Sequence, residues 1–204
     1  KGTGTESDPY QIYTAQELAN VNGTGYYMLM NDIDLTEWIN KNSPSKGWIP
    51  LGRNGNVMSN LLGNNKTISG LWCNTDEDYT ALIALAESIS IKDLTIEIAE
   101  GKNIKGGNYT AVIIGKASDC VMDNCHVVGS VIGKDYLGGF AGFVASGTIS
   151  NCTSEVSIQG ANYIGGIAGV VTATITKCRA VCSISGSSDV LCNAGGIVGY
   201  STAN

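Results

Sequence analysis

The stretch Tyr136–Gly160, YLGGFAGFVASGTISNCTSEVSIQG, decides the fold because the following stretch, Tyr163–Gly186, repeats its outline. The shared positions are Gly138, Gly139, Gly142, Ile149, Cys152 and Ile158 in the first stretch, and Gly165, Gly166, Gly169, Ile175, Cys178 and Ile184 in the second. The period is 27 residues from Gly138 to Gly165 and 26 from Cys152 to Cys178. A fixed period of this size indicates stacked supersecondary units.

Weaker copies of the unit lie on both sides. Upstream, its positions are filled by Tyr109, Gly115, Met122, Cys125 and Val131, and before these by Tyr79, Ile91 and Leu94. Downstream, Gly195, Gly196 and Gly199 open a further unit that stops at Asn204. We therefore expect Ser201–Asn204 to form an open coil, which further residues or an end-to-end association would complete.

The residues after Cys152 alternate with a period of two. Ser154, Val156 and Ile158 are small or apolar, and polar side chains stand between them. Such alternation is typical of strands with one face turned inward. Equivalent residues of successive units can stack at about 4.8 Å only if the chain winds in the same direction each time. The sequence thus predicts an all-β fold, a right-handed parallel β-helix, with the hand taken from the general preference of parallel connections.

This register predicts three inward columns of equivalent residues. They are Leu94, Cys125, Cys152 and Cys178; then Ile98, Gly129, Val156 and Cys182; and last Ile83, Ile113, Phe140, Ile167 and Ile197. The residues expected to be buried are Ile149, Cys152, Val156, Ile175, Cys178 and Cys182. His126, Glu155 and Arg179 are expected on the outside, and a shift of one residue would exchange the two faces.

The stretches YLGGFAGFVASGTISNC and YIGGIAGVVTATITKC resemble the GLUG repeat, a Gly-Gly-apolar-apolar-Gly run followed by a Thr-Ile-x-Asn-Cys strand. The opening GTGTESDPYQIYTAQELANVN, with YYMLMNDIDL, WIPLG and GNNKTISGL after it, resembles the start of the same β-helical domains. The resemblance implies a secreted or surface-anchored bacterial protein, adhesin-like or similar to the non-catalytic region of IgA-protease-type zinc peptidases. The family shows an aromatic residue and an aspartate where this chain has Met58 and Leu62, so irregular early coils are expected.

The composition fits one domain. Of 204 residues, 43% are apolar but only 7% aromatic, and 27 are glycine, as a narrow solenoid of small side chains and tight turns requires. We divide it into an N-terminal cap (1–25), irregular early coils (26–75) and repeats of 26–31 residues (76–204). The net charge is −6, and the 12 basic residues are scattered singly, so nucleic acid is not an expected partner. No apolar run approaches a transmembrane length, and any export signal is expected to have been removed.

The N-terminal cap has its own sequence signature. Pro9–Ile12 is predicted to be a short edge strand, and Thr14 with Glu17 forms a capping box that opens a helix through Asn20. Tyr26–Leu35 is predicted to be a strand, and Thr36–Lys46 a polar excursion that interrupts the repeat. Trp48–Gly52 and Thr67–Trp72 are predicted to be extended, with a turn at Gly63, Asn64 and Asn65. Loops that interrupt an array commonly lie on one side and can carry its binding function.

Seven cysteines raise the question of disulfides or a metal. Cys125, Cys152 and Cys178 share a column with Leu94, so we interpret them as packing residues and expect reduced thiols. Zinc is not expected, because no Cys-x2-Cys pair exists and the chain has one histidine. The acidic run Asp76, Glu77 and Asp78, with Asp32 or Asp34, is a weak calcium candidate, but a solvated turn is the simpler interpretation. No cofactor is expected.

Candidate ligand-binding residues fall into two groups. Trp38 and Trp72 belong to no repeat column and could stack on sugars. His126 is expected beside Thr153 and Arg179 on neighbouring strands, with Glu155 on the same outer face. The tyrosines Tyr79, Tyr109, Tyr136 and Tyr163 form a ladder that we interpret as packing rather than sugar binding.

The expected function is a non-catalytic surface or secreted module that is adhesin-like or contacts carbohydrate. Its partners would be host or microbial glycans or surface proteins. The alternative is a β-helical polysaccharide lyase or glycoside hydrolase. For it, Glu97 and Glu155 would face outward about 9.6 Å apart, two strand spacings, with Val128 between them.

Overall fold

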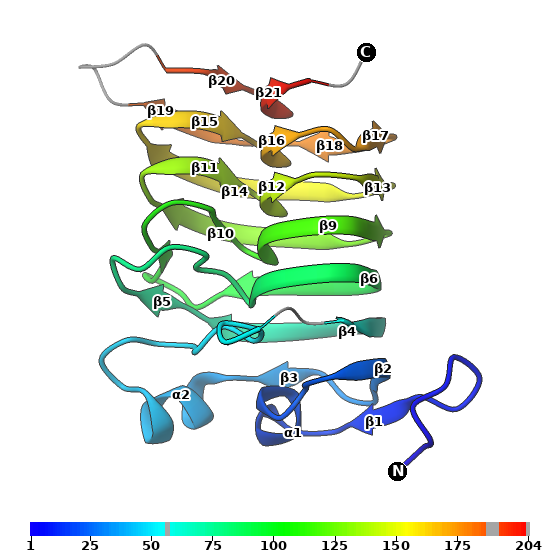
Figure 1. Ribbon diagram of the computed structural model, residues 1–204. Helices are drawn as coiled ribbons and strands as arrows, with labels where there is room; N and C mark the ends of the chain where they lie inside the picture. The colour runs from blue at the N-terminus through cyan, green and yellow to red at the C-terminus, as the bar shows by residue number, and fades with distance from the viewer. Residues whose placement is uncertain (56–57, 187–191, 203–204) are drawn as a thin grey trace.

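The computed structural model describes residues 1–55, 58–186 and 192–202 as a right-handed parallel β-helix (Figure 1). Every pairing between its strands is parallel. The coils climb from β1 near the N-terminus to β21 near the C-terminus, as predicted (Figure 1).

The N-terminal part of the chain contains both helices of the described residues. Its elements are β1 (Tyr10–Ile12), α1 (Ala15–Ala19), β2 (Thr24–Leu29), β3 (Ile33–Asp34), α2 (Thr36–Asn42), β4 (Met58–Leu71), β5 (Cys73–Asn74), β6 (Ile83–Ile98), β7 (Ile104–Lys105) and β8 (Thr110–Ala111). The later coils are made of strands alone. These are β9 (Ile114–Asp123), β10 (His126–Ile132), β11 (Asp135–Gly138), β12 (Ala141–Val144), β13 (Gly147–Ser150), β14 (Thr153–Gly160), β15 (Asn162–Gly165), β16 (Ala168–Val171), β17 (Thr174–Thr176), β18 (Arg179–Ala180), β19 (Ser183–Gly186), β20 (Ala194–Gly195) and β21 (Val198–Ser201).

The predicted N-terminal helix and its capping box are confirmed. Thr14 Oγ1 accepts a hydrogen bond from the Glu17 amide, and the Glu17 side chain accepts one from the Thr14 amide, so both halves of the capping box are present. The helix α1 lies at the bottom end of the β-helix in Figure 1 and buries Leu18 completely. β1 pairs with β2, which gives the first coil a neighbouring strand.

The predicted strand register is confirmed in the repeats. His126 pairs with Thr153, which pairs in turn with Arg179. Val128 lies between Glu97 and Glu155 in the same way. One position was wrong in the third column: Ile83 pairs with Ile114, so the residue equivalent to Ile113 and Phe140 is Leu82. The earlier unit lacks the glycines that fix the alignment, and both neighbouring residues are apolar.

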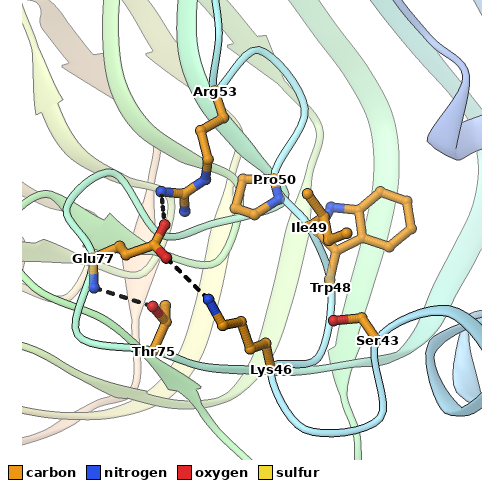
Figure 2. Close-up of a pocket in the computed structure, with 8 residues that line it drawn as sticks. All are labelled: Ser43, Lys46, Trp48, Ile49, Pro50, Arg53, Thr75 and Glu77. Atoms are coloured by element: carbon orange, nitrogen blue, oxygen red, sulfur yellow. Dashed lines mark hydrogen bonds and ion pairs between the residues drawn. The ribbon is translucent and has the colours of Figure 1, made fainter.

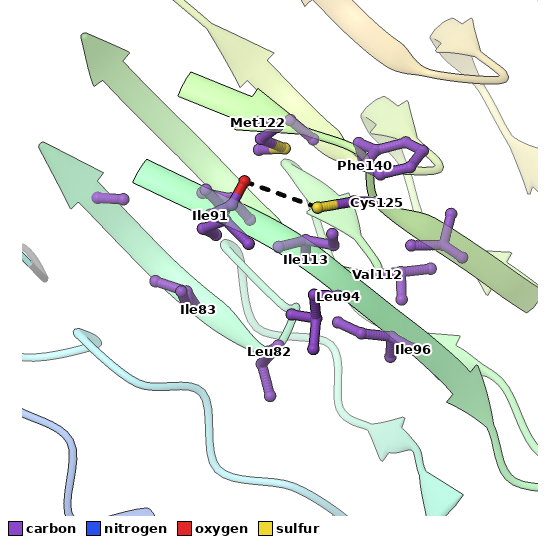
Figure 3. Close-up of a cluster of buried hydrophobic side chains, with 14 of the residues drawn as sticks. Leu82, Ile83, Ile91, Leu94, Ile96, Val112, Ile113, Met122, Cys125 and Phe140 are labelled. Atoms are coloured by element: carbon purple, nitrogen blue, oxygen red, sulfur yellow. Dashed lines mark hydrogen bonds between the residues drawn. The ribbon is translucent and has the colours of Figure 1, made fainter. Parts of the chain in front are cut away.

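The interior is apolar, as Figure 3 shows around Ile91, Met122, Cys125 and Phe140. Ile149, Cys152 and Val156 are buried as predicted. The Cys125 Sγ lies 3.6 Å from the Ile91 carbonyl oxygen, which it can reach as a weak donor. All seven thiols are unpaired in this structure, with Cys73, Cys120, Cys125 and Cys152 buried.

Four burial predictions were wrong. Ile175, Cys178 and Cys182 are only half-buried, because they belong to the coil of β17, β18 and β19. Among the described residues these strands pair only with the coil below, whereas β15 and β16 are also covered by β20 and β21. Glu155 and Arg179 are exposed as predicted, but His126 is half-buried because Glu155 of the next coil lies against its ring. The predicted open coil at Ser201–Asn204 lies partly outside the described residues, which end at Thr202.

The tyrosine ladder packs one corner of the β-helix. The ring centroids of Tyr79, Tyr109, Tyr136 and Tyr163 lie 4.9, 4.5 and 4.9 Å apart, with interplanar angles of 10°, 9° and 17°. Each inner ring therefore has both faces covered by neighbouring rings, which leaves no free face for a sugar. Gly142 makes this corner possible, since a Cβ there would lie 2.6 Å from the Tyr136 carbonyl oxygen.

The early coils are irregular. Tyr26–Leu35 is not one strand, because β2 ends at Leu29 and β3 holds only Ile33–Asp34. The excursion Thr36–Lys46 contains α2, a helix that the sequence pattern did not indicate. Trp48–Gly52 is not part of a strand, and its pairing is an isolated bridge between Leu51 and Ile83. The turn near Gly63 is a sharp bend within β4, with φ of 54° at Asn64 and 55° at Asn65.

Candidate binding cleft

The insertion, residues 36–55, leaves the β-helix after β3 and returns to it through Trp48 and Leu51. The Trp48 amide donates to the Trp72 carbonyl oxygen at 2.7 Å, and its indole Nε1 donates to the Leu82 carbonyl oxygen at 3.0 Å. With only 2% of its surface exposed, Trp48 anchors the insertion against two different coils. The loop on either side of it is therefore held in place, as a preformed binding surface requires.

An ionic hollow of about 220 Å³ opens on one side of this anchor. Figure 2 shows the Glu77 carboxylate between the ends of Lys46 and Arg53. The Lys46 Nζ lies 3.4 Å from Glu77 Oε1, and the Arg53 guanidinium contacts Oε2. Ile49 and Pro50 form an apolar wall beside these charges (Figure 2).

An amide hollow of about 510 Å³ lies against the same loop. Its polar lining includes Gln16, Asn20, Asn22 and Asn54. Its aromatic residue is Trp38, which packs on Trp48 with ring centroids 5.0 Å apart and donates from its indole Nε1 to Gln16 Oε1 at 3.1 Å.

The two hollows share Ile49, Pro50 and Arg53, and together we call them the insertion cleft. The exposed Ile49, 54% accessible, stands between the amides of one hollow and the charges of the other. A ligand spanning the cleft would meet hydrogen-bonding groups, an apolar ridge and a pair of cations in turn.

A separate hollow, which we call the corner groove, lies over the repeats and has a volume of about 350 Å³. It brings together three of the predicted ligand-binding residues, His126, Thr153 and Glu155. The His126 Nε2 lies 3.5 Å from Glu155 Oε1 and is shielded from solvent, but makes no hydrogen bond of good geometry. Arg179 follows Thr153 on the next strand but does not line the groove.

Four residues that line the corner groove have a positive φ, between 51° and 55°: Asn65, Asp93, Asn124 and Asn151. Lys177, with a φ of 53°, continues this series but does not line the groove. Asn124 Nδ2 donates to Asp93 Oδ1 at 2.6 Å, which links one coil to the next. Asparagine and aspartate tolerate this backbone conformation better than most residues, which explains their recurrence here.

The remaining predicted residues do not gather at one site. Trp72 lies outside both hollows of the cleft, with the Lys102 ammonium 4.9 Å from its ring centroid. The acidic run makes separate contacts: Asp76 with Lys105 at 3.7 Å, Glu77 with Lys46 and Arg53, and Asp78 with the Asn108 amide at 2.7 Å. Asp32 and Asp34 accept hydrogen bonds from the Thr67 and Thr36 amides, both at 2.8 Å. Within the described residues, no three His, Cys, Asp or Glu side chains come together in a way that could hold a metal ion, so the calcium candidates do not converge.

Sequence reasoning missed most of the insertion cleft. It named Trp38, but not Lys46, Ile49, Pro50 or Arg53. The only signal was the interruption of the repeat at Thr36–Lys46, which marks where a loop leaves the array without saying which side chains it places together.

The geometry defines the class of this protein as a right-handed parallel β-helix with a preformed cleft beside its N-terminal cap. The chain contains the GLUG motif, whose family model matches residues 135–159, from the start of β11 into β14. No helix among the residues placed by the structure is long and apolar enough to cross a membrane.

Comparison with known proteins adds one solved structure. The chain is similar to a crystal structure at 1.30 Å resolution described as a "putative immunoglobulin A1 protease from Bacteroides ovatus", at 15% identity and a TM-score of 0.45. The likeness covers 100% of this chain and 86% of that one. The identity and score are too low to carry function from that protein to this one. No curated protein matches the sequence.

Proposed function

We propose that the chain is a non-catalytic β-helical module of a secreted or surface protein, adhesin-like, and that it contacts carbohydrate through the insertion cleft. The observation that carries this proposal is the amide hollow, which Gln16, Asn20, Asn22 and Asn54 line together with Trp38. Side-chain amides both donate and accept hydrogen bonds, as sugar hydroxyls require, and an aromatic ring offers an apolar face.

The cleft offers ligand-binding groups without an evident catalytic pair. Among the described residues, Glu77 is the only carboxylate in its lining, and it contacts two cations. A glycosidase of the usual kind needs a pair of carboxyl groups, one on each side of the scissile bond. The charges of the ionic hollow therefore suit recognition better than hydrolysis.

A β-helical lyase or glycoside hydrolase is the second candidate, and the corner groove is the observation that favours it. His126 and Glu155 lie side by side there, and Asp93 is in the same lining. Glu97, the partner expected for Glu155, does not line the groove. The groove thus holds a histidine and two carboxylates, but not the Glu97 and Glu155 pair named from the sequence.

A glycan array and a reducing-sugar assay on the same sample separate the two candidates. We expect binding without release of reducing ends. Replacing Asn20 and Asn54 by alanine removes two exposed amides from the cleft and should weaken glycan binding by roughly tenfold, the value of one or two hydrogen bonds.

The matched control is Asn31→Ala, which removes an exposed amide that does not line the cleft. Equal binding by the parent protein and the cleft variant would contradict the assignment of the site. Release of reducing ends that His126→Gln abolishes would replace the binding function by the enzymatic one.

A further inference from the structure

The Glu77 side chain occupies the ionic hollow in the way that a bound carboxylate would. One of its oxygens contacts the Lys46 ammonium and the other the Arg53 guanidinium. Two cations therefore share one anion in the free protein, and the lining of the hollow keeps one positive charge in excess although the whole chain carries −6. The planar guanidinium matches carboxylate geometry especially well.

The backbone of Glu77 is fixed, whereas its side chain is free to leave. Its amide donates to Thr75 Oγ1 at 3.1 Å, and its carbonyl oxygen accepts from the Gly107 amide at 2.7 Å. The side chain is 48% exposed, so rotation about its own bonds would carry the carboxylate into water. Exposed ion pairs contribute little to stability, because water solvates both charges well.

Arg53 also lines the amide hollow, so a ligand held there lies beside the residue whose guanidinium contacts Glu77. Lys46, in contrast, lines only the ionic hollow. A sugar ring packed on the ridge of Ile49 and Pro50 could thus place a ring carboxylate against Arg53 and Lys46 while its hydroxyls face the amides. The other nearby carboxylates do not compete, since Asp76 pairs with Lys105 and Asp78 accepts from the Asn108 amide.

We infer that the insertion cleft selects sugars that carry a carboxylate, and that Glu77 stands in for that carboxylate until the ligand displaces it. The inference rests on the proposed carbohydrate binding and adds the class of sugar. The shared chemistry is a carboxylate on a sugar ring, which sialylated and uronic-acid glycans both supply.

Isothermal titration calorimetry of the intact chain with sialyllactose, trigalacturonate and neutral lactose tests the inference. Both anionic ligands should bind more tightly than lactose, and this preference should shrink as salt is raised. Glu77→Gln keeps the shape but releases both cations, so it should tighten anionic binding by about two- to fivefold, the equilibrium value of an exposed ion pair. Arg53→Gln should weaken anionic binding by about tenfold and leave lactose binding within a factor of about two.

The matched control is Lys105→Gln, which removes a neighbouring lysine that pairs with Asp76 and lines neither hollow. It should leave the preference for anionic ligands unchanged. Thermal unfolding of each variant checks that the fold is intact.

Each remaining outcome decides between the two ideas. Binding of lactose as tight as that of the acids would overturn the inference and leave the proposed function standing. Weaker anionic binding by Glu77→Gln would also overturn it, because Glu77 would then be a ligand-binding group rather than a competitor. Absence of binding to all three sugars, together with an empty glycan array, would overturn both.

Discussion

Replacing a motif glycine by alanine should destabilise the protein at one position of the array but not at the equivalent position two coils later. Gly139 of the GLUG motif faces the coil interior, where an added Cβ would lie 2.2 Å from Ser154 Oγ and 2.3 Å from the Gly166 carbonyl oxygen. Gly196 is the equivalent glycine two coils later, and among the described residues nothing lies within 4 Å of its Cβ position. The two sites differ in whether another coil is stacked over them.

The magnitude follows from these contacts. A Cβ cannot approach backbone so closely, so Gly139→Ala must push two coils apart, and overpacking of this kind costs about 1–3 kcal/mol. At Gly196 the added Cβ meets no obstacle among the described residues, and the backbone φ is not left-handed. Gly196→Ala should therefore be neutral or stabilise the protein by up to about 1 kcal/mol, because alanine lowers the conformational entropy of the unfolded chain.

Urea unfolding of the two variants and the parent protein, monitored by circular dichroism, measures the free energies of unfolding. We expect a lower midpoint for Gly139→Ala and an unchanged or higher midpoint for Gly196→Ala. Equal destabilisation by both substitutions would refute the reasoning, because the effect would then come from glycine itself and not from the stacked coil.

Three further predictions concern the thiols, the pH dependence and the half-exposed end of the β-helix. Burial raises the pKa of Cys73 and of Cys120 to about 12, and the shared hydrogen bond with the Cys125 thiol raises the pKa of Cys152 to about 12, so these thiols should react slowly with a thiol reagent at pH 8. After unfolding without reductant all seven should react, and almost no free thiols would contradict the packing role. Hydrogen bonds from Ser150 and Asn151 hold the pKa of Asp123 below its ordinary value of 3.8, so its contribution to stability is present above that pH and is lost as the pH falls through the lowered value. Asp123→Asn should therefore make the urea midpoint depend less on pH between pH 5 and pH 2. A pH dependence equal to that of the parent protein would contradict this prediction. Val181 and Ile197, 49% and 37% exposed, lie at the half-covered end, and we propose that it associates end to end. Lysine at both positions should abolish concentration-dependent association in sedimentation velocity, whereas a parent protein that stays monomeric at high concentration would show the proposal to be wrong.

The sequence alone determined the architecture and most of the register. A repeat of 26 to 27 residues with period-two alternation fixes which face of each strand points inward, so the sequence was enough to predict the pairing of His126, Thr153 and Arg179. The capping box at Thr14 could also be predicted from the sequence, because its two hydrogen bonds join residues three positions apart. These features depend on local periodicity, which a sequence displays directly.

The tertiary structure alone decided burial at the last complete coil and the content of the cleft. Cys178 has the same place in its repeat as Cys152 but is half-buried, since burial depends on the coil above and not on the residue. Lys46 and Arg53 contact Glu77, which lies 31 and 24 residues further along the sequence. Both cations belong to the insertion, which is not part of the repeats. No period relates an insertion to the coil on which it folds, so only the path of the chain in space brings those three charges together.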